Sequence, residues 1–151
     1  MDFREGGYIY FTAVGFPTRC YKMGVDAQGK PLFTLVGSTK ASGDGRVGIG
    51  IPTITTYKGQ AGTGILWITG PVTGLQAFNA VPKDGVLTPI TLPPTGGLNK
   101  FLRPAFGDGR LYITDSKGNI ICLGSPVALP LNCTQPVNFG EVSNSFTHLA
   151  L

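Results

Sequence analysis

The chain has 151 residues, enough for one domain or for part of a larger one. Its 23 glycines, 12 prolines and only 13% charged residues disfavour long helices and predict many short strands joined by tight turns. The formal net charge is +4, but the basic residues are scattered singly, so nucleic-acid binding is not expected. A hydrophobic content of 42% argues against disorder, and no stretch approaches the roughly 20 apolar residues of a membrane-spanning helix.

The first predicted unit begins at Gly7 and contains three strands. We expect them at residues 8–14, 19–25 and 31–36. The connecting segments are rich in Gly, Pro and Asp, residues that suit turns. Residues 37–48 are mostly small and are expected to form a loop.

The second predicted unit starts with a strand at residues 49–54. A hairpin follows over residues 65–80, with its turn at 70–74, and residues 86–92 supply an outer strand. Residues 58–64 form a Gly-rich loop. We expect this loop and residues 37–48 to lie on one rim, where they could present a ligand-binding surface.

The third predicted unit covers residues 101–124. It holds a strand at 104–106, a Gly-Asp-Gly turn at 107–109 and a hairpin that turns at residues 115–119.

All three units share one hairpin pattern: an apolar residue, an aromatic residue, an apolar residue and a threonine, then a turn and a second strand. The aromatic residues, Tyr10, Trp67 and Tyr112, are 57 and 45 residues apart. Blades of β-propellers repeat at roughly 40–50 residues. The pattern therefore predicts an all-β fold, a partial β-propeller of about two to three four-stranded antiparallel blades whose ring is not closed. Trp67 is expected in the core of its blade.

The composition changes after Gly124. We expect a partial propeller over residues 1–124, a linker at 125–135 and the truncated start of a further β domain at 136–151.

The sequence from Arg103 to Leu123, with its Gly-Asp-Gly-Arg-Leu-Tyr segment, resembles a repeat of the quinoprotein-alcohol-dehydrogenase-like β-propellers. The segment Pro136–Val142 is similar to the opening strand of an immunoglobulin-like domain of the Hydin and abnormal-spindle type. This order of domains implies a large secreted or surface-attached fungal protein, of which the chain is a fragment.

The resemblance implies a non-catalytic scaffold or ligand-binding platform, whose partners would be a protein or carbohydrate ligand and the remaining blades. An alternative is a fragment of a quinone- or metal-dependent oxidoreductase whose active residues lie outside the chain. A third possibility is a small self-contained β-sandwich that acts as a binding module. We assign no catalytic, cofactor-binding or metal-binding residue and expect no cofactor, because the family's adjacent cysteine pair is missing. The only histidine, His148, stands close to the C-terminus, and Gly43–Gly48 fits a dinucleotide motif but precedes a β-branched, proline-containing segment.

Two features suggest export. Asn132 begins an Asn-Cys-Thr tripeptide that fits the N-glycosylation pattern. Cys122 and Cys133 could form a local disulfide, or could instead be buried as small hydrophobic residues. We expect the parent protein to be extracellular or attached to the cell surface, although the N-terminus has no signal peptide.

Overall fold

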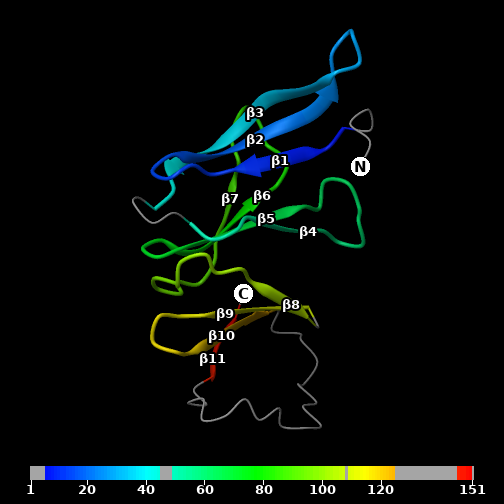
Figure 1. The fold of residues 1–151 in the computed structure, drawn as a ribbon. Helices are drawn as coiled ribbons and strands as arrows, with labels where there is room; N and C mark the ends of the chain where they lie inside the picture. The colour runs from blue at the N-terminus through cyan, green and yellow to red at the C-terminus, as the bar shows by residue number, and fades with distance from the viewer. Residues whose placement is uncertain (1–5, 45–48, 108, 125–145, 151) are drawn as a thin grey trace.

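The computed structural model describes residues 6–44, 49–107, 109–124 and 146–150. These residues contain eleven strands and no helix. The strands form three open sheets that follow one another along the chain and are stacked face to face (Figure 1). The prediction of an all-β chain is confirmed.

The N-terminal sheet contains β1 (Tyr8–Phe11), β2 (Pro17–Val25) and β3 (Pro31–Ser42), in this antiparallel order. The predicted loop at residues 37–48 is wrong in its first half, because β3 continues to Ser42 and pairs with β2 as far as Pro17. The register shifts near this end of the pair. There the hydroxyl of Thr39 accepts a hydrogen bond from the backbone N–H of Thr18 at 3.0 Å, in place of a backbone carbonyl.

The central sheet contains β4 (Thr53–Thr55), β5 (Ile65–Gly70), β6 (Gly74–Asn79) and β7 (Pro89–Ile90) in sequential antiparallel order. The predicted hairpin is confirmed, with Gly74 at a φ of +71° in its turn. The two flanking strands are shorter than predicted. Nearly all of β5 is buried, because both faces of this sheet are covered.

The C-terminal sheet contains β8 (Ala105–Gly107), β9 (Arg110–Thr114), β10 (Ile120–Gly124) and β11 (Phe146–Ala150). The predicted β9–β10 hairpin is confirmed, and β11 lies parallel to β10 at the edge of the sheet. The predicted linker at 125–135 and most of the predicted domain at 136–151 lie outside the described residues. The division into domains therefore stays a prediction.

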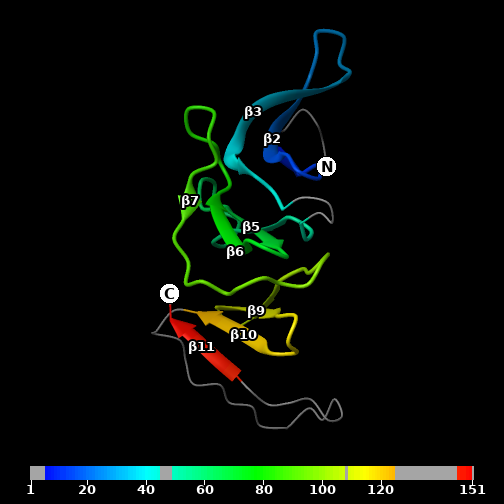
Figure 2. The ribbon, with the colours of Figure 1, turned by 90° about the vertical axis from the view of Figure 1, so that its left-hand side faces the viewer.

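Figure 2 shows the three sheets one above another, and two apolar layers lie between them. The layer between the N-terminal and central sheets contains Cys20, Leu66, Ile68, Phe78, Ala80 and Leu87. The layer between the central and C-terminal sheets contains Trp67, Leu75, Ala77, Leu98, Leu111, Ile113, Ile121 and Leu123. Because side chains of a strand alternate between faces, β5 and β6 contribute to both layers. Trp67 is a core residue, as predicted, and its indole N–H donates to the hydroxyl of Thr55 at 2.8 Å.

Candidate functional site

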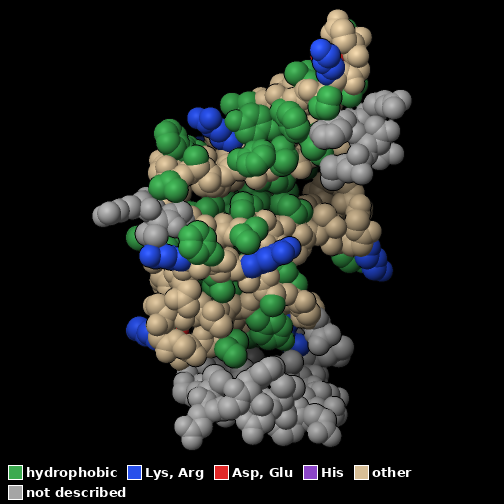
Figure 3. Space-filling model, in the orientation of Figure 1, with side chains coloured by type: hydrophobic (Ala, Val, Ile, Leu, Met, Phe, Trp, Pro, Cys, Tyr) green, Lys and Arg blue, Asp and Glu red, His purple; other side chains and the backbone are tan. Residues whose placement is uncertain are grey.

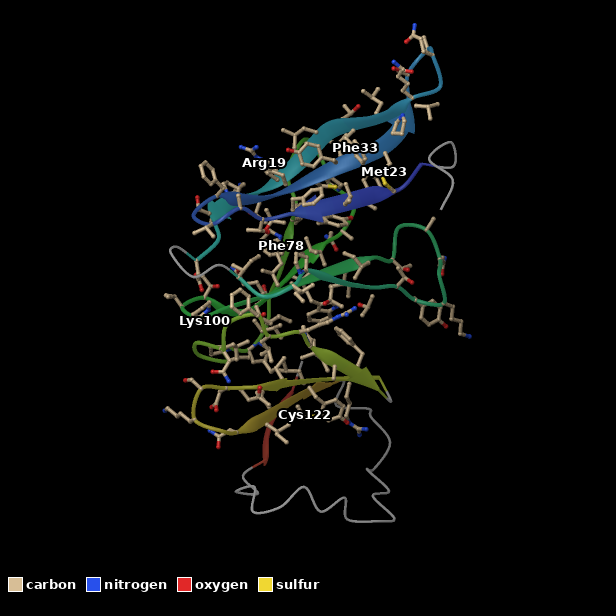
Figure 4. All side chains as sticks on the ribbon, viewed as in Figure 1. Arg19, Met23, Phe33, Phe78, Lys100 and Cys122 are labelled. Carbon is tan, nitrogen blue, oxygen red and sulfur yellow. The ribbon has the colours of Figure 1, made fainter. Side chains whose placement is uncertain are left out.

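A cleft of about 550 Å³ opens between the N-terminal and central sheets. Its walls come from the end of β3, from β5, β6 and β7, and from the segment that follows β7. Figure 4 places Phe78, one of its lining residues, in the space between the two sheets. The lining residues are Thr18, residues 39–43, Ile68, Val72, Thr73, residues 75–78, Leu87, Pro89, Ile90, Leu92 and residues 93–96.

The wall formed by the central sheet is apolar except for one side chain. Gln76 pairs directly with Ile68 across β5 and β6, so the two side chains share a face. Phe78, two positions along the same strand, lies on that face as well. Gln76 is half-buried, and no described residue binds its amide. This amide is therefore available to a ligand.

The opposite wall is built by the irregular end of β3. The hydroxyl of Thr39 donates to the carbonyl of Ala41 at 2.8 Å while it accepts from Thr18. These bonds hold the strand in the bulged course that its shift of register requires. Lys40, between Thr39 and Ala41, is exposed and is the only charged residue in the described part of the lining.

One end of the cleft is tied together by Asp44. Its carboxylate accepts hydrogen bonds from the backbone N–H of Val72 at 2.6 Å, the backbone N–H of Thr73 at 3.0 Å and the hydroxyl of Thr73 at 3.3 Å. Asp44 is only 9% exposed. It thus attaches the segment after β3 to the β5–β6 turn and supports both walls of the cleft.

Tyr10 and Cys20 lie in the apolar layer that the two sheets share. The Tyr10 hydroxyl donates to the carbonyl of Ala80 at 2.6 Å, which links the sheets directly. Burial raises the pKa of Tyr10 well above its ordinary value, and the neighbouring Cys20 raises it further. Burial also raises the pKa of the Cys20 thiol to about 11, against the opposing effect of its hydrogen bond with Tyr10. Cys20 is therefore a neutral thiol at physiological pH and a poor nucleophile.

A second surface lies on the outer face of the N-terminal sheet. Cross-strand neighbours share a face, and the pairs Phe11 with Arg19 and Tyr21 with Leu35 point away from the central sheet. Phe11, Phe33 and Leu35 are 56%, 48% and 53% exposed. Figure 3 shows hydrophobic side chains gathered over this sheet. A hollow of about 430 Å³ on this face is lined by Phe11, Ala13, Phe16, Pro17, Arg19, Tyr21 and Phe33.

Of the predicted modification sites, only Cys122 is among the described residues, and it is not part of the cleft lining. Cys122 is buried in β10, in the C-terminal sheet. Cys133 and Asn132 lie outside the described residues, so the disulfide and the glycosylation site stay predictions. His148 stands in β11, opposite Cys122 in the strand register.

Residues 39–43 of the cleft lie in the segment 37–48 that was predicted to present a ligand-binding surface, whereas residues 58–64 do not line the cleft and the roles of Asp44 and Gln76 were not predicted. Asp44 stands in a Gly-Asp-Gly segment of the predicted loop 37–48, and its local sequence gives no sign of its hydrogen bonds to the β5–β6 turn. Gln76 could have been identified from the sequence, because it is a polar residue in a mostly apolar strand. A polar residue inside an otherwise apolar strand marks a place where a covered face meets solvent or a ligand.

In the described part of the chain, no cluster of three or more His, Cys, Asp or Glu residues could hold a metal ion. Nor does any helix there have the length and hydrophobicity to cross a membrane. No family model, no curated protein and no solved structure matches the chain. The likeness to quinoprotein-type propellers therefore depends on the sequence pattern alone.

Proposed function

We propose that the chain is part of a β-propeller-type assembly and acts as a non-catalytic scaffold that binds a ligand. The observation that carries this proposal is the stack of three small sheets, joined by two apolar layers, with an apolar face left open at one end. The central sheet supports it further, because its four strands follow one another in sequential antiparallel order, as in a propeller blade.

The open face indicates what continues the stack. Its aromatic and aliphatic side chains belong to the same residue types that fill the two internal layers. Packed sheets lie about 10 Å apart and bury such side chains between them. The occupant that fits is a further small antiparallel sheet with an apolar face, and a carboxylate on that sheet would pair with Arg19.

The ligand-binding part of the proposal concerns the cleft. Pockets for small molecules are commonly about 300–1,000 Å³, mostly apolar, with a few polar groups. The cleft has a volume of about 550 Å³, an apolar wall and the polar groups of Lys40 and Gln76.

The test of the scaffold is the behaviour of the chain on its own. Because the open face lacks its neighbouring sheet, we expect concentration-dependent association in size-exclusion chromatography with light scattering, and a broad thermal transition. Replacing both Phe11 and Phe33 by serine should reduce the association.

Phe101→Ser is the matched control, since Phe101 is 69% exposed but is not among the residues that line the hollow on the outer face. It should leave the association unchanged. A monomer with one sharp transition, unaffected by the double substitution, would overturn the proposal.

A further inference from the structure

We infer that the cleft binds a small, largely apolar molecule that carries one carboxylate, and that Lys40 pairs with this carboxylate. The inference rests on the proposed ligand-binding role and adds the chemical class of the ligand.

The body of the ligand is specified by the apolar part of the cleft. Ile68, Phe78 and Leu87 come from the layer between the two sheets, and all three are almost fully buried. Pro89, Ile90, Leu92, Pro93 and Pro94 extend this apolar lining along and beyond β7. A hydrocarbon chain or a ring would cover the part of this lining that is still exposed, which belongs to the residues along and beyond β7, and each CH₂ group of the ligand that is buried there contributes about 0.8 kcal/mol.

The hydroxyl groups of the lining do not specify a polyhydroxylated ligand. Those of Thr39, Thr73 and Thr95 each donate within the chain, to Ala41, Asp44 and Gly96. Among the described lining residues, Ser42 alone has a hydroxyl without a hydrogen bond. The Thr18 hydroxyl is paired with that of Thr12 at 2.6 Å. A sugar needs many free donors and acceptors, so an apolar molecule with one polar end fits this cleft better than a carbohydrate.

The polar end is specified by charge. Among the described residues that line the cleft, Lys40 is the only charged one, and no ion pair joins it to another described residue. The nearest carboxylate in sequence, that of Asp44, already accepts three hydrogen bonds. The cleft lining holds one ammonium group, that of Lys40, and one side-chain amide, that of Gln76, and a carboxylate can accept hydrogen bonds from both kinds of donor.

The experiment compares octanoate with octanol, which has a similar chain but no charge, by equilibrium dialysis against the purified chain. Octanoate should bind more tightly. Because Lys40 is exposed, Lys40→Gln should weaken octanoate binding roughly two- to fivefold and leave octanol binding unchanged. Lys40→Arg should retain the preference for the carboxylate.

Two further variants separate a specific site from general binding. Lys30→Gln removes the same charge from the β2–β3 turn, outside the cleft lining, and should leave binding unchanged. Ala41→Trp places a large ring at an exposed lining position and should weaken both compounds.

The inference is overturned if octanoate does not bind, if the two compounds bind equally, or if Lys40→Gln and Lys30→Gln have the same effect. None of these results bears on the scaffold, because the scaffold is tested separately by the association of the Phe11 and Phe33 variants.

Discussion

Asp44 is the residue whose removal should loosen the cleft most directly. In Asp44→Ala, the backbone N–H groups of Val72 and Thr73 lose their acceptor in a partly buried place. A buried donor without a partner costs about 1–3 kcal/mol, and a hydrogen bond to a charged group contributes about 1.5–3 kcal/mol. Allowing for water that enters the opened site, we expect the free energy of local opening at the β5–β6 turn to fall by about 3 kcal/mol.

Amide hydrogen exchange of the β5–β6 turn measures this loss where it occurs. A loss of about 3 kcal/mol corresponds to roughly a hundredfold faster exchange at Val72 and Thr73, because each 1.4 kcal/mol is a factor of ten. Exchange in the β9–β10 hairpin should not change. Association of the chain does not obscure this readout, which reports on individual peptide segments.

Two controls define the result. Asp44→Asn keeps one oxygen acceptor and should lower the free energy of local opening by only about 1 kcal/mol. Asp84→Asn removes the same charge from a turn whose φ of +50° asparagine tolerates, and should have no effect on this turn. If Val72 and Thr73 exchange at the wild-type rate in Asp44→Ala, the assignment of Asp44 as the link between the walls is wrong.

Three further outcomes are expected. The folded state holds the protons of Tyr10 and Cys20 more tightly than the unfolded state. The free energy of unfolding, measured in urea, should therefore fall as pH rises from 9.0 towards about 11. Cys20→Ala should make the free energy of unfolding less dependent on pH in this range. Gly74→Ala should lower Tm by scanning calorimetry, since φ is +71° and the new Cβ would meet the carbonyl oxygen of Gly96. Trp67→Ala should lower the free energy of unfolding, measured in urea, by about 3–5 kcal/mol, because it opens a cavity between the central and C-terminal sheets.

The hairpins were predictable because their information is local. The β9–β10 turn shows why: Asp115 accepts hydrogen bonds from the backbone N–H groups of Lys117 and Asn119, both at 2.8 Å. The hydrogen bonds from Asn119 also lower the pKa of the Asp115 carboxyl. Such contacts depend on residues within four positions, so turn residues between apolar strands suffice to predict them.

The course of β3 was not predictable from its own residues. Gly37 and Ser38 indicate a loop, but the backbone N–H of Ser38 donates to the carbonyl of Gly85, and the N–H of Leu87 donates to the carbonyl of Ser38. These bonds, at 3.1 and 2.9 Å, come from a segment almost fifty positions later in the chain. Tertiary contacts thus override a weak local preference.

The sequence alone was sufficient for the class of structure: glycine-rich turns, alternating apolar strands and three similar hairpins lead to small antiparallel sheets. Only the tertiary structure decided which faces of those sheets are covered, and so where the cleft and the open apolar face lie. The physical reason is that successive side chains of a strand point to opposite faces, so the sequence shows which side chains share a face. Whether that face is buried depends on another sheet that packs against it. Asp44, Gln76 and Lys40 acquire their places around the cleft from this packing.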